Sequence, residues 1–261
     1  MTFRLRPHLL SRHRRTSNPA LSPNPLLHAL LLGGASLLLA AAPGLAAAAG
    51  PATAATSAPP AAASAPSGKA ASEVVVPPAS ASADATLKAA VEGTLAAIRS
   101  DPVAKGGDPA RTAQLVETHF LPFTDFRRTA QLAAGDAWKT ATPQQQDAIF
   151  KQFQALLVRV YAAQLTQIQG QHIQFRFDRP KPVPNSTDVV VGSQVHTDTD
   201  DMTTSYRLAK TPAGYKVYDI DLMGIWLIQV YRQQFGDQLR QGGVDGLIKF
   251  LAAHNAEHGA N

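Results

Sequence analysis

Few residues in this sequence have the types and spacing that catalysis requires. The strongest grouping is the string HNAEH at 254–258, which fits the H-x-x-E-H pattern of inverted zinc peptidases, with two histidines four positions apart on one helix face. The string ends three residues before the last residue, where helices fray, and no third zinc ligand accompanies it. We therefore interpret it as a solvated helix end rather than a metal site.

Other groupings that could do chemistry are weaker still. His119, His172 and His196 fall on separate predicted elements, and the chain contains no G-x-S-x-G string and no glycine-rich phosphate loop. The acidic run at 198–201 lacks the ordered glycine and the terminal glutamate of a calcium loop, so we interpret it as a polar hairpin tip. Cysteine is absent, which excludes disulfides, thiol catalysis and a lipid-modified cysteine. We expect no enzyme activity, no catalytic or metal-binding residues and no cofactor.

The N-terminal region has the composition of an export signal. The first 25 residues carry five arginines and no acidic residue, and residues 26–42 are almost entirely apolar. This order predicts a cleaved secretory signal peptide over residues 1–48, and an uncleaved N-terminal anchor is the alternative. Without those five arginines the 24 basic residues fall to 19, equal to the 19 acidic residues, so the net charge of +5 belongs to the leader. A neutral remainder gives no support to nucleic-acid binding.

The rest of the chain divides into a linker and one domain. Residues 49–83 consist almost wholly of Ala, Pro, Ser and Thr, and we expect a disordered linker because this segment has too little apolar bulk to offset its ordering entropy. The folded domain is predicted at 84–258, which is long enough to build its own core. After a first helix, a second is predicted with Asp108 as its N-cap, Pro109 at its first position and Pro122 beyond its end.

Two further helices are predicted in the middle of the chain. Residues 123–134 form a short helix that ends at Gly135. Thr142 and Gln145 form a capping box for a long helix that continues to about Ile168. Apolar residues recur every three or four positions along this helix, so we expect one of its faces to be buried.

After residue 170 the apolar period changes to two, which predicts a four-stranded antiparallel meander. Two closing helices, separated by the pair Gly242-Gly243, are expected at about 225–241 and 244–257. Helices, then consecutive strands, then helices predict an α+β fold rather than a βαβ repeat. The predicted strands are residues 173–177, 189–195, 202–210 and 215–222.

Several ordered motifs together resemble one known family. The strings LPFTDF at 121–126, ATPQQQ at 141–146, FQALLVRVY at 153–161 and GVDGLI at 243–248 resemble the MlaC family, and the resemblance extends over roughly residues 87–254. Two features depart from that family: the linker is longer than expected, and Val230 stands where many members have a polar residue.

The resemblance implies a periplasmic phospholipid carrier of the Mla pathway, which maintains outer-membrane lipid asymmetry. The implied fold is a nuclear-transport-factor-like cone, in which helices frame a curved four-stranded antiparallel sheet around an apolar cavity. The implied partners are phospholipid, the inner-membrane Mla ABC transporter complex and an outer-membrane Mla lipoprotein with its porin. The protein itself is expected to be a monomer that binds no nucleic acid.

A carrier of this kind must replace the contact of lipid chains with the membrane interior. Each methylene exposed to water costs about 0.8 kcal/mol, so a 16-carbon chain represents on the order of 12 kcal/mol. We expect the apolar face of the long helix and the sheet to supply those contacts, with the Tyr231 hydroxyl near the head group. The predicted lipid-binding residues are Leu157, Val160, Tyr161, Phe175, Phe177, Val191, Val195, Tyr206, Val217, Ile220, Leu222 and Tyr231.

Two other functions remain open at this point. A carrier of hopanoid or another polycyclic lipid would need a wider cavity, and a non-lipid periplasmic scaffold protein would have a dry core and copurify without lipid. The segment around residues 123–138 is expected to frame the domain in each case, with Arg127 or Arg128 available to partners.

Overall fold

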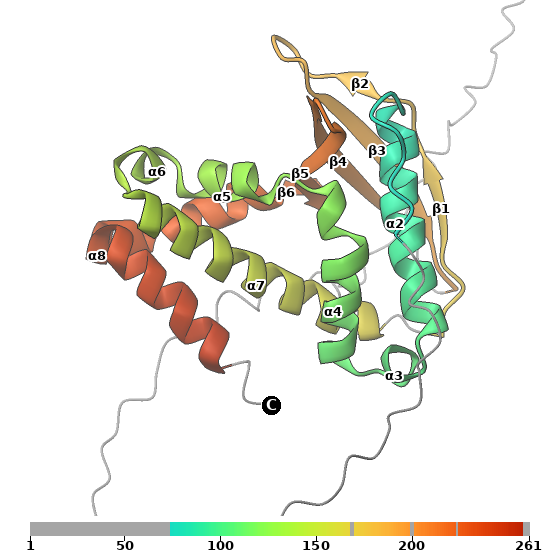
Figure 1. The fold of residues 1–261 in the computed structure, drawn as a ribbon, viewed down its shortest axis with the longest axis horizontal. Coiled ribbons are helices and arrows are strands. Elements are labelled where there is room, and N and C mark those ends of the chain that lie inside the picture. Colours follow the sequence, from blue (N-terminus) through green and yellow to red (C-terminus); the bar gives the residue numbers. More distant parts are fainter. Residues whose placement is uncertain (1–73, 168–169, 199–200, 223, 258–261) are drawn as a thin grey trace, which may run out of the picture. The chain divides into compact units, whose positions relative to one another are not determined.

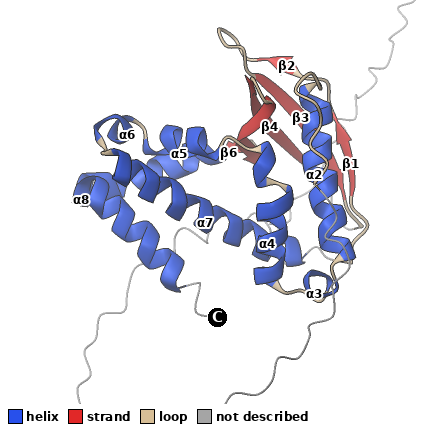
Figure 2. Ribbon diagram, in the orientation of Figure 1, coloured by secondary structure: helices blue, strands red, loops and turns tan. Residues whose placement is uncertain are grey.

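The described part of the chain is an α+β domain. The structure, a computed structural model, describes residues 74–167, 170–198, 201–222 and 224–257. The predicted signal peptide (1–48) lies outside these residues, as does the predicted linker up to residue 73. Most of the helices gather beside an open antiparallel sheet, and one helix lies along it (Figure 2). No helix in these ranges is both long and apolar enough to span a membrane.

Local sequence sets the ends of several helices. The Asp108 carboxylate accepts a hydrogen bond from the Arg111 N–H at 2.7 Å, and Gly135 ends α5 with a φ of 61°. The predicted capping box forms, since the Thr142 N–H donates to the Gln145 amide oxygen at 2.9 Å and the Gln145 N–H donates to the Thr142 hydroxyl at 3.2 Å. Within the described ranges the helices are α2 (Ala83–Ser100), α3 (Pro102–Lys105), α4 (Pro109–His119), α5 (Phe126–Ala134), α6 (Asp136–Thr140), α7 (Pro143–Gln167) and α8 (Leu227–Glu257), with a 3₁₀ turn, η1, at Leu121–Phe123.

The closing helices differ from prediction at one end. Ile225 and Trp226, predicted as the start of a helix, form a short strand instead, because their backbone pairs with Leu222 and Asp221. The expected break is present, since Gly243 interrupts α8 with a φ of 61° and a ψ of −159°.

The sheet contains the four predicted strands and two very short ones. Its order is β1-β3-β4-β5-β6, with β2 pairing with β3, and every pair is antiparallel. The two extra strands have two residues each, which is too short for an alternating pattern to reveal. The strands are β1 (Gln174–Phe177), β2 (Lys181–Pro182), β3 (Val189–His196), β4 (Asp201–Thr211), β5 (Gly214–Leu222) and β6 (Ile225–Trp226).

One face of the sheet is apolar, and we call it the inner face. Phe175 lies opposite Val195, Val191 opposite Tyr206, and Tyr206 opposite Ile220. Because side chains alternate along each strand, these residues share one face. Helix α2 lies along the sheet (Figure 1) and covers this face with an apolar stripe. The resulting sheet cluster consists of Ala83, Leu87, Val91, Val191, Tyr206, Leu208 and Val217.

A second core forms among the helices. Helix α7 packs against α4, α5 and α8, and Phe153 at its centre contacts Phe126, Tyr231 and Phe235 with ring centroids 5.4, 4.8 and 4.9 Å apart. The pairs with Tyr231 and Phe235 are edge-to-face, an arrangement that contributes about 0.5–1.5 kcal/mol per pair beyond burial. The helical cluster consists of Ala130, Ala133, Ala134, Trp138, Ile149, Phe153, Leu156, Leu157, Phe235, Leu247 and Leu251.

A β-bulge at Tyr218 joins the helices to the sheet. Arg207 pairs with Asp219 and Leu208 pairs with Val217, so Tyr218 is an extra residue without an opposite partner on β4. The Tyr218 carbonyl accepts a hydrogen bond from the Thr129 hydroxyl of α5 at 2.7 Å. The preceding Val217 carbonyl accepts one from the Asp125 N–H at 2.8 Å. The segment around η1 and α5 is therefore part of the frame, as expected.

The two arginines of that segment have partners within the domain. Arg128 donates to both carboxylate oxygens of Asp188, at 2.6 and 3.3 Å, and lies 3.9 Å from the ring centroid of Tyr218. The Tyr218 hydroxyl donates to the same carboxylate at 3.0 Å. Arg127 pairs with Asp147 at 2.7 Å on the exposed surface. Arg128 thus fastens α5 to the loop before β3.

Replacing Asp188 should measure the strength of this contact. Asp188→Asn keeps the shape but leaves Arg128 facing a neutral group, and we expect the free energy of unfolding to fall by about 1–3 kcal/mol because a charged hydrogen bond is lost. The matched control is Asp147→Asn, which removes an exposed pair and should cost about 0–1 kcal/mol. Chemical denaturation of the two variants gives both values, and equal losses would contradict the assignment.

The same contact predicts a pH dependence. Burial raises the pKa of Asp188, but hydrogen bonds from Arg128 and Tyr218 outweigh it and hold the pKa below its ordinary value of 3.8. A lowered folded-state pKa means that the stabilisation is fully present above the unfolded value and is lost as the pH falls through the folded value. The wild type should therefore lose more stability below about pH 4 than Asp188→Asn does.

Candidate functional site

A partly open pocket of about 280 Å³ lies where α2, α3 and the end of α7 approach the start of β1. Ligand pockets for small molecules usually measure about 300–1,000 Å³, so this one could hold a head group or part of a chain but not a whole two-chain lipid. Most of its lining is apolar, with two cationic side chains. The lining residues are Leu95, Ile98, Arg99, Lys105, Leu165, Gly170, Gln171 and Ile173.

The apolar wall of the pocket continues the stripe of α2 that covers the sheet. Leu95 lies one helical turn beyond Val91 and packs against the sheet cluster. Ile98 and Leu165 belong to a third, smaller group of apolar residues, the corner cluster. Phe120 packs against both clusters. The pocket therefore opens at the boundary between two separately packed regions. The buried residues of the corner cluster are Ala97, Ile98, Ala104, Leu115, Val116 and Val158.

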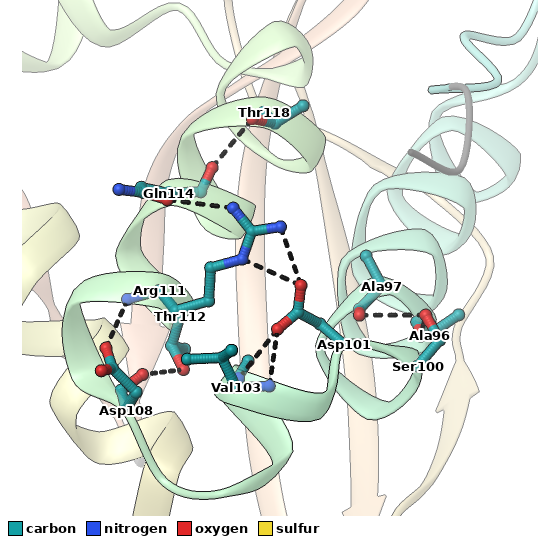
Figure 3. A network of polar contacts seen from close by, with 11 residues as sticks. Ala96, Ala97, Ser100, Asp101, Val103, Asp108, Arg111, Thr112, Gln114 and Thr118 are labelled. Carbon is teal, nitrogen blue, oxygen red and sulfur yellow. Dashed lines mark hydrogen bonds and ion pairs between the residues drawn. The ribbon is translucent and has the colours of Figure 1, made fainter. Parts of the chain in front are cut away.

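A polar network fixes the helix corner beside the pocket (Figure 3). The Asp101 carboxylate accepts hydrogen bonds from the N–H groups of Val103 and Ala104 at 3.0 and 2.9 Å and from the Arg111 side chain at 2.8 Å. The Arg111 hydrogen bond, followed by that from Ala104, lowers the pKa of Asp101. This carboxylate holds the end of α2, the start of α3 and the first turn of α4 together.

The twelve predicted lipid-binding residues do not gather in one cluster, and none of them lines this pocket. Leu157, Val160, Tyr161 and Tyr231 lie in or against the helical cluster. Val191, Tyr206 and Val217 are in the sheet cluster, with Phe175, Phe177 and Ile220 packed against it. Val195 is buried on β3, and Leu222 is half-buried at the end of β5. Their role as lipid contacts stays a prediction.

A buried carboxylate positions the start of α8 near some of these residues. Asp219 is 2% exposed and accepts hydrogen bonds from the Ile228 N–H at 3.1 Å and from Arg207 at 2.8 Å. Burial raises the pKa of Asp219 in spite of these partners. Arg207 also lies 3.7 Å from the ring centroid of Trp226. The first turn of α8, which leads to Tyr231, is thus tied to the sheet.

Burial also raises the pKa of three tyrosine side chains. It raises the pKa of Tyr206 and of Tyr231 to about 12 and holds the pKa of Tyr161 well above its ordinary value of 10.0, with smaller contributions from nearby Tyr231 and Asp219. The Ser193 hydroxyl beside Tyr206 has the opposite, smaller effect on that phenol. At neutral pH these phenols are therefore uncharged, so they can border an apolar ligand.

Metal chemistry finds no further support. His258 of the HNAEH string lies outside the described residues, and among the described residues no three His, Asp or Glu side chains come together in a way that could hold a metal ion.

Comparisons with known proteins bear on the whole domain. The family described as MlaC protein matches residues 88–253, which is more than half of the chain. The chain belongs to the MlaC family. The predicted family is therefore confirmed.

A solved structure similar to this MlaC-family chain is the phospholipid-binding protein from Ralstonia solanacearum, determined in complex with a phospholipid. The two sequences are 40% identical, the match covers 69% of this chain and 99% of that chain, and the TM-score is 0.63. The relative shares the α+β fold over almost its full length.

Alkaline titration should test the packing around the MlaC-family tyrosines. Because the folded-state pKa values of Tyr206 and Tyr231 are raised to about 12, an unfolded phenol ionises first, and stability must fall as the pH rises above about 10. We expect phenolate absorbance and loss of circular dichroism to appear together in one transition, with Tyr206→Phe reducing its amplitude. Ionisation of most tyrosines near pH 10 with the dichroism unchanged would show that these phenols are solvated.

Proposed function

We propose that this protein is a periplasmic phospholipid carrier, which shields acyl chains from water and shuttles lipid between inner- and outer-membrane Mla complexes. The observation that carries the proposal is the 40% identity to a protein solved in complex with a phospholipid, across 99% of that protein's chain. Family membership supports the same role. The basic and apolar leader supports export to the periplasm.

The packing of the domain supports a lipid site between the sheet cluster and the helical cluster. Phe175, Phe177 and Ile220 on the inner face of the sheet are only half-buried. Tyr161 and Tyr231 on the helices are also half-buried as whole residues, although their phenol groups are buried enough to raise the pKa. A half-buried apolar side chain gains stabilisation of about 25 cal/mol per Å² when a ligand covers it. The fully buried members of the predicted set, such as Val191, already have protein neighbours. We infer that acyl chains contact mainly the half-buried residues, with the described pocket as the opening.

Non-covalent carriage explains why no catalytic set is needed. A lipid that moves between membranes keeps all its bonds, and the protein replaces one apolar environment with another. The partners we propose on family grounds are an inner-membrane ABC transporter complex and an outer-membrane lipoprotein with a porin.

Native mass spectrometry with lipid extraction tests the binding function. The chain, expressed with its leader in a Gram-negative host and purified, should carry phospholipid. Bound polycyclic lipid would instead indicate a hopanoid-type carrier, and a ligand-free mass that persists after incubation with phospholipid vesicles would indicate a dry scaffold.

A charge introduced into the proposed site should reduce lipid occupancy, whereas a charge introduced on the exposed surface should not. Leu222→Glu places a carboxylate at a half-buried position of the predicted site, and we expect lipid occupancy to fall at least about fivefold because burying an unpaired charge is costly. Val75→Glu is the matched control, since Val75 is 80% exposed. Thermal unfolding of both variants should confirm that they remain folded. Equal occupancy in the two variants would remove Leu222 from the site.

Transfer requires that the opening can widen. The chain has no cysteine, so Leu95→Cys and Leu165→Cys together allow a short bifunctional thiol reagent to bridge the pocket between α2 and α7. We expect the bridged, lipid-loaded protein to keep its lipid in the presence of acceptor vesicles, while either single variant treated with the same reagent releases it. Undiminished release from the bridged protein would contradict an opening at this place.

A further inference from the structure

We propose that Arg99 and Lys105 form a binding site for a phosphate group at the pocket, and that its source is the head group of an anionic phospholipid. In its choice of source this inference rests on the proposed function. The pocket brings these two cations together from different helices, the last turn of α2 and the end of α3. No acidic residue is among the side chains that line it.

The two cations at the pocket are not neutralised by a carboxylate among the residues that the structure describes. Within the described ranges, neither Arg99 nor Lys105 forms an ion pair or a hydrogen bond through its side chain. The acidic residues nearest in the sequence are Asp101 and Asp108. The Asp101 carboxylate already accepts hydrogen bonds from Val103, Ala104 and Arg111, and the Asp108 carboxylate accepts one from the Arg111 N–H. The charges at the pocket are therefore available to a ligand. The arginines that do pair with carboxylates are Arg111, Arg127, Arg128, Arg207 and Arg240.

The rest of the lining indicates what accompanies the anion. Leu95, Ile98 and Leu165 present apolar surface directly beside the two cations. A guanidinium binds phosphate oxygens through two parallel hydrogen bonds, and an ammonium adds a point charge. An anion joined to hydrocarbon satisfies both kinds of surface at once, whereas free phosphate would leave the apolar wall exposed to water. The volume of about 280 Å³ suits a head group and the first methylenes of its chains.

The Asp101 network fixes the backbone that carries the two cations. Asp101 and Arg111 hold the α2–α3 corner (Figure 3). Arg99 lies in the last turn of α2 and Lys105 at the end of α3, on either side of that corner. Two positive charges fixed at one opening should favour a head group with net negative charge over a zwitterionic one, whose own cation would be repelled.

The test is a competition between two lipids with identical chains. Delipidated wild-type protein is incubated with equal amounts of phosphatidylglycerol and phosphatidylcholine, and bound lipid is counted by native mass spectrometry. We expect phosphatidylglycerol to be preferred about fivefold, and Arg99→Gln with Lys105→Gln to bring the ratio near one because bound phosphatidylglycerol falls. The charge-preserving exchange Arg99→Lys with Lys105→Arg should retain most of the preference.

A matched control removes the same charges elsewhere. Arg179→Gln with Lys151→Gln also deletes one arginine and one lysine, both exposed and neither in the pocket, and it should leave the preference unchanged. An equal loss in this control, or an unchanged preference in the Arg99 and Lys105 variant, would overturn the site and leave two solvated helix-end cations.

Titration calorimetry with inorganic phosphate separates the sources of the anion. Lipid preference without measurable binding of phosphate alone supports the head-group assignment, whereas phosphate binding that the double glutamine variant abolishes, with no lipid preference, overturns that assignment in favour of a free anion. If the wild type binds neither lipid, the proposed carrier function fails on its own, and the phosphate titration still decides whether the two cations form an anion site.

Discussion

Helices α5 and α8 are fastened to the sheet through three consecutive residues of β5. Val217 and Tyr218 accept hydrogen bonds from the segment that starts α5, and Asp219 accepts one from the first turn of α8. The bulge makes this possible, because the extra residue at 218 turns its side chain away from the regular alternation and toward Arg128 and Asp188. The positions of α5, α8 and, through them, α7 depend on this short stretch.

Such a localised join has consequences for function. The helical cluster and the sheet cluster are each packed internally, and α7 makes its main contacts with other helices. A ligand could enter between the helical cluster and the sheet cluster without disturbing the packing of either one. Proteins resist continuous deformation of a packed interior, so a boundary between two cores is a physically reasonable place for a cargo that must both enter and leave.

Much of this architecture could be predicted, because its signals are local. The capping box at Thr142 and the break at Gly243 depend on neighbours in the sequence, and the long strands show themselves by alternation. The contact between Arg128 and Asp188 could not be predicted, since sixty positions separate the two residues. The bulge at Tyr218 could not be predicted either, because an aromatic residue at this position is also typical of a regular strand.

The candidate sites show the same limit. The prediction of lipid contacts rests on apolar character, which describes cargo contacts and plain core equally well, and ten of the twelve predicted residues lie in or against two different clusters. No sequence motif predicts the pocket, because its lining comes from four separate segments: α2, α3, α7 and the residues before β1. The apolar patterns of the sequence include four of its lining residues: Leu95, Ile98 and Leu165 on helix stripes and Ile173 in a strand pattern.

The bulge also makes the fold depend on the number of residues in β5. If position 218 were deleted, Asp219 would still face Arg207 and Val217 would still face Leu208, so every strand pair could form as before. The ring that meets Arg128 and the carbonyl that meets Thr129 would nevertheless be gone. At this point of β5 the fold therefore depends on the number of residues as well as on their kind, and deletion of one residue should destabilise the domain more than an exchange that keeps the chain length.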